Sequence, residues 1–291
     1  MFSQFFGNYL VETKKITAEQ YDSCMEYIKA NRVQLGLIAE TEGLLTRAQT
    51  NELNYMQMQT DKRFGDLAVE KGYLTEADVS YLLGRQGNPY LIFVQALIEG
   101  DIMTAEEIDA CLKSYQEDNQ FSDETITAIK EGNIEHLLLA FIDEESSDYK
   151  DIIGLTLRNI VRFVSSYIRV EKGEFVKEAS FKAAAYQHTI GAYNGMLGFA
   201  SNDDAGILKI ADGYAKESFA AVDEDALDSV AEFTNCVNGL YAAELSFNEI
   251  KIDMQPPEYH IDTVIDCGGQ PFYVMPLYIE GERVNIIVKV G

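Results

Sequence analysis

Residues 225–244 of this 291-residue chain read DALDSVAEFTNCVNGLYAAE and have the periodicity of one amphipathic α-helix. With successive residues about 100° apart, four of them fall within about 60° of one another: Asp228, Glu232, Asn235 and Gly239. The opposite side is apolar and is formed by Leu227, Val230, Phe233, Val237, Leu240 and Tyr241. We therefore expect a helix that packs by one face and presents a carboxylate and a carboxamide on the other. That pair can hold a cation and orient a water molecule; an ordinary solvated helix face is the alternative.

The sequence around this helix resembles the CheX branch of the CheC/CheX/FliY family of chemotaxis phosphatases. The family signature is Asp or Ser, three residues, Glu, two residues, Asn, and a later Pro. The corresponding positions here are Asp228, Glu232, Asn235 and the pair Pro256-Pro257. The segments HTIGAYNGMLGFASNDDAGILKIADGYAKE (188–217) and FYVMPLYIEGERVNIIVKVG (272–291) resemble the strands and helix that flank the signature. The resemblance extends over residues 148–291.

This resemblance implies a phosphatase that acts on the aspartyl phosphate of a CheY-like response regulator. By the same resemblance, Asn235 would orient the attacking water and Glu232 would pair with a lysine of the receiver. Asp228, expected in the first turn, would support the start of the helix rather than the chemistry. Mg²⁺ is expected on the receiver, and neither a cofactor nor a metal on this chain. Homodimerisation is also implied. The alternative is a non-catalytic adaptor that binds a receiver or responds to cyclic di-GMP.

The first half of the chain contains a 29-residue repeat. Related segments begin at Phe6, Leu35, Phe64 and Phe93, and a threonine follows each of them at Thr17, Thr46, Thr75 and Thr104. A threonine followed three residues later by an acid or amide is typical of a capping box at the start of a helix. Gly43 and Gly72 suit the left-handed turn that ends the preceding helix. The repeat therefore predicts four stacked helix pairs in one all-α module.

These repeats resemble the MshEN domain, in which two 24-residue motifs bind cyclic di-GMP. The motifs would run over residues 34–57 and 63–86, and the matching positions are Gly36, Gly43, Gln57, Arg63, Gly65, Gly72 and Gln86. The first motif departs from the pattern, because Gln34 stands in place of an arginine and Thr50 and Asn54 in place of leucines. Loss of one charge-assisted contact weakens binding by about 1.5–3 kcal/mol. We therefore expect cyclic di-GMP to bind weakly or not at all, and docking of a partner is the alternative role.

The sequence thus predicts two domains. Residues 1–116 would form the MshEN-like helical repeat domain, residues 117–147 a connector with a helix, and residues 148–291 a CheX-like α+β domain with a largely antiparallel sheet. The last of these would open with an amphipathic helix from Asp151 to Ile168. Gly281 would lie in the turn between the final two strands.

Composition narrows the classes of partner. A formal net charge of −25 argues against nucleic acid polymers and anionic membranes, because both repel an acidic chain. No apolar run is long enough for membrane insertion and the start does not resemble a signal peptide, so we expect a cytoplasmic protein. The four cysteines and three histidines are scattered, which predicts free thiols and no metal site.

Overall fold

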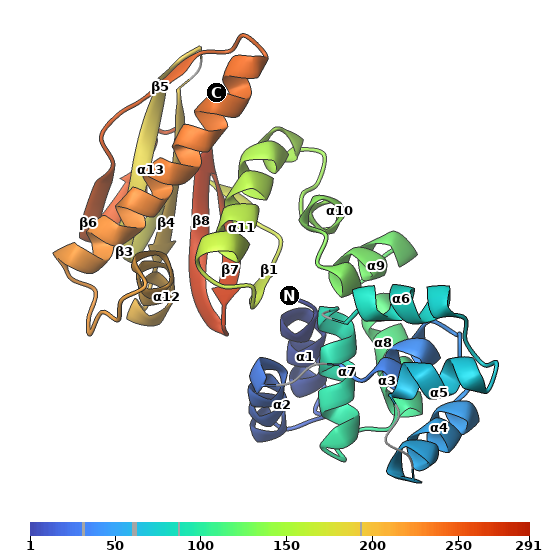
Figure 1. Ribbon diagram of the computed structural model, residues 1–291. Helices are drawn as coiled ribbons and strands as arrows, with labels where there is room; N and C mark the ends of the chain where they lie inside the picture. Colours follow the sequence, from blue (N-terminus) through green and yellow to red (C-terminus); the bar gives the residue numbers. More distant parts are fainter. Residues whose placement is uncertain (31–32, 60–62, 87, 193) are drawn as a thin grey trace. The chain divides into compact units, whose positions relative to one another are not determined.

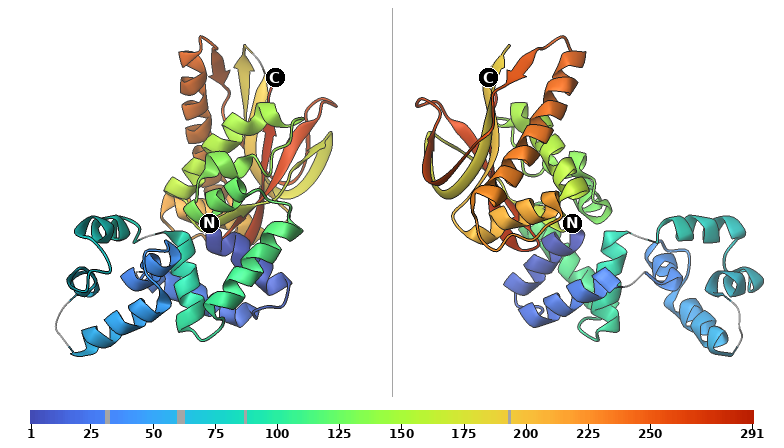
Figure 2. Two further views of the ribbon diagram at one scale, coloured as in Figure 1. Left: turned by 90° about the vertical axis from the view of Figure 1, so that its right-hand side faces the viewer. Right: turned by 60° about the vertical axis from the view of Figure 1, so that its left-hand side comes forward.

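The computed structural model describes residues 1–30, 33–59, 63–86, 88–192 and 194–291 (Figure 1, Figure 2). It contains two compact units, one of Phe2–Gly132 and one of Asn133–Gly291 together with Met1. The first is helical throughout its described residues, and the second combines helices with an antiparallel sheet. The predicted two-domain fold class is therefore confirmed. The structure divides the expected connector (117–147), since its first helix belongs to the first unit and its remainder to the second.

The first unit consists of helix pairs, as the 29-residue repeat predicted. The pairs are α1 (Phe2–Glu12) with α2 (Ala18–Ala30), α3 (Leu35–Thr41) with α4 (Arg47–Gln59), α5 (Phe64–Glu70) with α6 (Glu76–Gly84), and α7 (Pro89–Glu99) with α8 (Ala105–Asp118). A further helix, α9 (Asp123–Glu131), follows and ends at Gly132 in a left-handed conformation.

Every repeat starts its second helix with the same reciprocal cap. The backbone N–H of Thr17 donates to the Gln20 side chain at 2.8 Å, and the Gln20 N–H donates back to the Thr17 hydroxyl at 3.1 Å. The same two bonds join Thr75 to Asp78. They recur in the other two repeats, between Thr46 and Gln49 and between Thr104 and Glu107. Since these bonds are local, the sequence alone predicted where the four helices begin.

The turn between paired helices is also repeated. One residue in each turn has a positive φ, and these residues are Lys14, Gly43, Gly72 and Asp101. One carbonyl at the end of each first helix accepts the N–H groups five and six residues onward, and these carbonyls belong to Leu10, Ala39, Ala68 and Leu97. This arrangement satisfies carbonyls that a helix end would otherwise leave unpaired.

Close packing within a pair accounts for the glycines that follow the first residue of the second and third repeats, Gly36 and Gly65. A Cβ added to Gly36 would lie 2.7 Å from Thr50 Cγ2, and one added to Gly65 would lie 2.8 Å from Val79 Cγ1. These distances are shorter than real Cβ contacts, so a larger residue at either position would push the two helices apart.

The second unit begins with helices and continues as a sheet. Its helices are α10 (Ile134–Leu138), the short 3₁₀ helix η1 (Ser147–Tyr149), α11 (Lys150–Phe163), α12 (Asp204–Ala215) and α13 (Glu224–Phe247). Its strands are β1 (Ile168–Val170), β2 (Glu174–Val176), β3 (Glu178–Gly191), β4 (Gly195–Ser201), β5 (Ile252–Met254), β6 (Glu258–Asp266), β7 (Phe272–Ile279) and β8 (Glu282–Lys289). The helix expected to reach Ile168 ends at Phe163 instead, and Ile168 opens β1.

The strands form one antiparallel sheet in the order β1-β7-β8-β4-β3-β5, with β2 paired to β7 and β6 paired to β3. The turn between β7 and β8 contains Glu280 and Gly281, both with positive φ, as a two-residue hairpin requires. Helix α13 runs across β3, β4, β5 and β6, and α12 packs beside it on the same sheet (Figure 1).

Side chains on opposite faces of the sheet form two buried layers. On the helix-covered face, the ring of Phe199 in β4 stacks on that of Phe233 in α13, with centroids 5.5 Å apart. Met196 and Ala200 alternate with Phe199 along β4 and therefore point to the other face. There they join a cluster with Phe272 and Ile287. Both faces of the sheet beneath α13 are therefore packed against other side chains.

Candidate functional site

Helix α13 carries the predicted site and begins at a defined cap. Asp223 precedes the helix, and its side chain accepts a hydrogen bond from the Ala226 N–H at 3.0 Å. Glu224 and Asp225 occupy the first turn, where a negative charge favours the helix dipole. Asp228 therefore lies in the second turn, so the expectation that it supports the helix start was wrong.

The two faces of α13 divide largely as the periodicity predicted. Asp228, Glu232 and Asn235 are exposed on one side. The buried side includes Leu227, Val230, Phe233, Val237 and Tyr241. Leu240 is the exception to the predicted apolar face, because 42% of it remains exposed. It lies at the edge of the apolar side, where the helix periodicity alone does not decide burial.

Glu232 is exposed and makes no hydrogen bond or ion pair with the residues that the structure describes. Tyr214 of α12 is close enough for the Glu232 carboxylate to act on its pKa. Burial, followed by the proximity of Cys236 and Glu232, raises the pKa of Tyr214. Tyr214 therefore stays protonated near neutral pH, and the carboxylate of Glu232 is left available to a cation from outside.

Asn235 is held by a hydrogen-bond network that sequence reasoning missed. Its Oδ1 accepts from Nε2 of Gln187 at 2.7 Å. The same Nε2 donates to the backbone carbonyl of Gln255 at 2.7 Å. Nδ2 of Asn238 donates to Gln187 Oε1 at 2.8 Å. Gln187 is only 1% exposed, and all the polar atoms of its side chain are paired.

A signal for this network does exist in the sequence. Gln187 follows Ala183 and Ala185 at two-residue spacing in β3, so it lies on the same face of the strand as two buried alanines. A carboxamide on such a face needs polar partners. Which partners it finds depends on how β3 and α13 pack, because Gln187 and Asn235 are 48 residues apart in the chain.

Gly239 lies one helical turn after Asn235 on the same face. A Cβ added there would meet a single atom within 4 Å, Met254 Cε at 3.9 Å, among the described residues. Glycine within a helix is less stable than alanine by about 0.5–1 kcal/mol. Unlike Gly36 and Gly65, Gly239 is therefore not required by packing inside the chain.

The pair Pro256-Pro257 lies between β5 and β6. The residue before it, Gln255, donates its N–H to the carbonyl of His188 at 2.9 Å and presents its own carbonyl to Gln187. The prolines thus follow the one backbone group that ties the loop to the network below Asn235.

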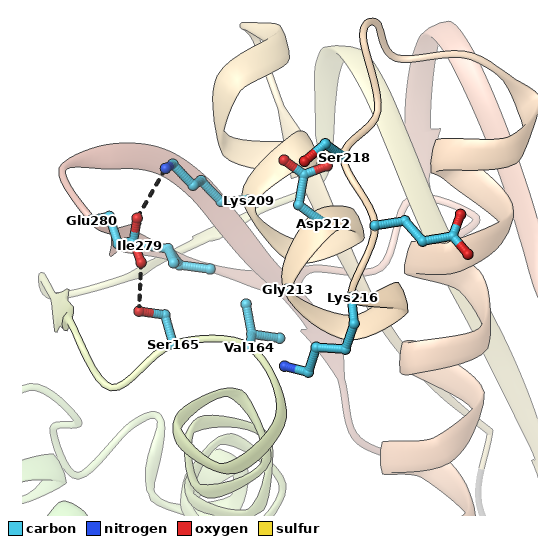
Figure 3. A pocket seen from close by; sticks show the side chains of 10 residues that line it. Val164, Ser165, Lys209, Asp212, Gly213, Lys216, Ser218, Ile279 and Glu280 are labelled. Atoms are coloured by element: carbon cyan, nitrogen blue, oxygen red, sulfur yellow. Dashed lines mark hydrogen bonds and ion pairs between the residues drawn. The ribbon is translucent and has the colours of Figure 1, made fainter.

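The second unit also contains a polar pocket of about 400 Å³ away from this helix face (Figure 3). It lies between α12, the end of α11 and the β7–β8 turn. Lys209 Nζ contacts Glu280 Oε2 at 2.9 Å, the Ser165 hydroxyl donates to Glu280 Oε1 at 3.0 Å, and Lys216 Nζ donates to the Phe163 carbonyl at 2.7 Å. Because these groups bind one another, the pocket is explained by the packing of α11 and α12, and no predicted site residue lines it.

Five of the seven predicted nucleotide-binding positions of the first unit have structural roles in this fold. Gly36 and Gly65 allow close packing of the paired helices. Gly43 and Gly72 lie in the turns with φ angles of +70° and +69°. Gln86 Nε2 donates to the carbonyl of Val33 at 3.0 Å. Arg63 is exposed and precedes α5. Gln57 lies in α4, and its side chain is outside the described part of the structure.

A small cavity of about 160 Å³ opens beside the first motif, between α3, α4 and α7. All three positions at which that motif departs from the MshEN pattern line it: Gln34, Thr50 and Asn54. Gln34 and Gln95 join at its rim, with the Gln34 N–H donating to Gln95 Oε1 at 2.7 Å, and both side chains donate to Glu99.

Three further features concern metal ligands, membrane-spanning helices and the state of the cysteines. Among the described residues, no cluster of three or more histidine, cysteine, aspartate or glutamate side chains could hold a metal ion. Within the same residues, no helix has the length and apolar character needed to cross a membrane. All four cysteines are free thiols.

The comparison with protein families places the second unit. Residues 184–277 match the family described as "Chemotaxis phosphatase CheX". The matched segment begins within β3, includes β4, α12 and all of α13, and ends within β7. It therefore contains Asp228, Glu232 and Asn235 as well as Gln187. This part of the second unit is therefore similar to the CheX family.

Several solved structures resemble the same half of the chain. A chemotaxis protein CheX from Desulfovibrio desulfuricans is 14% identical with a TM-score of 0.43, covering 49% of this chain and 98% of that one. A CheC-like superfamily protein from Shewanella sp. PV-4 is 20% identical with a TM-score of 0.43, covering 49% and 96%. The structure of a CheX-CheY-BeF3-Mg+2 complex from Borrelia burgdorferi is 17% identical with a TM-score of 0.34, and the match covers 47% of this chain and 93% of that one. Comparison with curated proteins gave no match.

Proposed function

We propose that the second unit is a phosphatase for the aspartyl phosphate of a CheY-like response regulator, in chemotaxis or a related two-component pathway. The observation that carries the proposal is the joint placement of Glu232 and Asn235. Both are exposed on one face of α13 inside the CheX match, and the fold itself does not need Glu232. Asn235, in contrast, is tied to the network beneath the helix through one of its two polar atoms.

The proposed reaction needs few groups from this chain. The oxygen of a water attacks phosphorus, and the bond between phosphorus and the receiver's aspartyl oxygen breaks. The aspartate leaves as a carboxylate, and the protons of the water remain with inorganic phosphate and solvent. The receiver supplies Mg²⁺ and the groups that bind the phosphoryl oxygens, as phosphoryl transfer requires. This chain supplies alignment of the water, which is a positioning effect.

Within that scheme Asn235 orients the water and Glu232 docks the receiver. An amide side chain is not basic enough to remove a proton, so orientation is the role open to Asn235. An exposed carboxylate is a weak base near neutral pH, which favours an ion pair between Glu232 and a receiver lysine. Asp228 is exposed on the same face, four residues before Glu232, and adds negative charge where the lysine approaches.

Variants of the two residues separate these roles. Asn235→Ala is expected to abolish the acceleration of receiver dephosphorylation while receiver binding persists. Glu232→Ala is expected to raise KM, with a smaller effect on kcat. The rise should correspond to a loss of ~1–3 kcal/mol of binding free energy, the value typical of a charged hydrogen-bonded pair. The measurement is phosphate release from a purified CheY-like receiver phosphorylated with acetyl phosphate and Mg²⁺. Ser246→Ala is the matched control, because Ser246 is exposed on α13 and bonds only its own helix among the described residues.

The result also separates the enzyme from the alternative functions. Full activity of the Asn235→Ala variant would contradict the role of Asn235. Binding of the phosphorylated receiver by the wild-type chain without faster loss of phosphate would favour a non-catalytic adaptor. The cavity beside the first motif is lined by the residues that depart from the MshEN pattern, which supports weak or absent binding of cyclic di-GMP.

Self-association through the sheet edge belongs to the same proposal. Strand β6 pairs only with β3 in the described sheet, and it exposes Ile261 by 53% and Val264 by 60%. An exposed strand edge with apolar side chains favours pairing with a second copy. We expect a homodimer by light scattering in solution, and a cytoplasmic protein, since its substrate is an intracellular signalling domain.

A further inference from the structure

We propose that Gln187 is a positioning residue that fixes which end of the Asn235 carboxamide faces the receiver. This inference rests on the proposed function for the role of Asn235, and on the hydrogen-bond network for the orientation. The orientation it assigns directs Oδ1 into the unit and leaves the Nδ2 amine to face the partner.

The orientation follows from a backbone group that cannot change its character. The carbonyl of Gln255 can only accept a hydrogen bond, so the atom of Gln187 that lies 2.7 Å from it must be the nitrogen Nε2. That same Nε2 lies 2.7 Å from the Asn235 side chain. Asn235 must therefore offer its oxygen at this contact.

Asn238 closes the arrangement from the other side. Its Nδ2 donates to Gln187 Oε1 at 2.8 Å, and Asn238 is 2% exposed. Rotating the Gln187 amide by half a turn would set its nitrogen against the amine of Asn238 and its oxygen against the Gln255 carbonyl. Rotating the Asn235 amide would set two amines against each other. Either rotation leaves buried polar groups unpaired, so one orientation is strongly favoured.

The consequence for the reaction is that Asn235 acts on the water as a hydrogen-bond donor. Its Nδ2 makes no hydrogen bond to any residue within the described ranges. An N–H that donates to one lone pair of the water oxygen leaves the other lone pair free to attack phosphorus. The protons of the water then point to acceptors on the receiver, which carries carboxylates and phosphoryl oxygens. Asn235 thus contacts the water, and Gln187 sets the orientation of the Asn235 carboxamide.

Gln187→Met tests this division, because methionine is of similar length and cannot donate to either acceptor. We expect kcat for phosphate release from the acetyl-phosphate-treated CheY-like receiver to fall about 10- to 100-fold, the range for a misaligned group, with KM changed less than about 2-fold. Thr234→Val is the control. Thr234 is fully buried in the same helix, next to Asn235, but its hydroxyl bonds only the Val230 carbonyl of that helix in the described structure. It should leave kcat unchanged.

Two measurements keep the proposal testable if Gln187→Met fails to fold. Asn235→Asp retains an oxygen for Gln187 and another facing outward, but it has no N–H to donate. We expect it to be as inactive as Asn235→Ala, and retention of more than half the wild-type kcat would overturn the proposal. Side-chain amide exchange by NMR gives an independent readout: the NH₂ protons of Gln187 should exchange slowly and those of Asn235 rapidly.

The outcomes distinguish this inference from the proposed function. If the wild-type chain does not accelerate dephosphorylation, the proposed function fails, and the exchange rates still report the orientation of Asn235. If the wild-type chain is active but Gln187→Met folds and keeps its kcat, the positioning role of Gln187 is overturned. Slow exchange of the Asn235 amine would overturn the assigned orientation even in an active enzyme.

Discussion

Gly36 and Gly65 of the helical repeats and Gly239 of α13 all lie within α-helices, but they differ in how closely other side chains pack against them. Gly36 and Gly65 each face a side chain of the paired helix at a distance that no larger residue tolerates. Gly239 faces a single atom at ordinary contact distance among the described residues. The first two are explained by the chain itself. The third is unexplained until a partner is placed against α13.

The same contrast separates the polar residues of the two units. Thr17, Thr46, Thr75 and Thr104 repeat because each one caps a helix. Glu232 caps nothing and makes no ion pair or hydrogen bond with the described residues. In the first unit, the regularly spaced threonines therefore indicated how the helices are built. In the second unit, Glu232, which lacks any such bond to the described residues, indicated a functional site. Replacing a glycine in each unit tests this difference.

Gly65→Val should produce the larger effect. The added carbons would overlap Val79, and overpacking of this kind destabilises a protein by about 1–3 kcal/mol. We expect faster amide hydrogen exchange in α5 and α6 of the full-length chain, measured by mass spectrometry. Exchange in α13 and phosphatase activity should stay at wild-type levels. Unchanged exchange in α5 and α6 would mean that the glycine repeat has another cause.

Gly239→Ala should act in the opposite direction on stability. Alanine within a helix is favoured over glycine by about 0.5–1 kcal/mol, and space for its Cβ exists beside Met254. We therefore expect slower exchange in α13 together with reduced receiver turnover, because a methyl group then stands one turn from Asn235 on the docking face. A variant that is both more stable and fully active would show that no partner approaches this part of the helix.

The smallest effect is expected from cyclic di-GMP. Calorimetric titration of the full-length chain should give no submicromolar dissociation constant, because the first motif lacks its arginine and the chain is strongly acidic. Submicromolar binding that is lost on changing Arg63 or Gln86 would assign the first unit a nucleotide-sensing role.

Local interactions decided how much of this structure the sequence could predict. The four capping boxes involve residues three apart, and the polar face of α13 follows from its periodicity, so both were predicted. Asp228 was misplaced because the helix begins one residue earlier than the expected range, with Asp223 as its cap. Leu240 was assigned to the buried face because periodicity gives the direction of a side chain and not the extent of the sheet beneath it.

The network around Asn235 was beyond prediction for a different reason. It joins Gln187 in β3, Asn238 in α13 and the carbonyl of Gln255 after β5, and these contacts exist only once the helix has packed on the sheet. A buried glutamine in an alanine-rich strand indicates that partners exist. It does not identify them.

Multiple turnover tests the central claim most directly. A CheY-like receiver, phosphorylated with acetyl phosphate in Mg²⁺ and freed of the donor, is mixed with this chain at one part in fifty. We predict release of all the phosphate well before the receiver's own decay would allow, with the Asn235→Ala variant leaving that decay unaltered. Phosphate release that never exceeds the spontaneous rate, while the chain still binds the phosphorylated receiver, would contradict catalysis by the Glu232–Asn235 face.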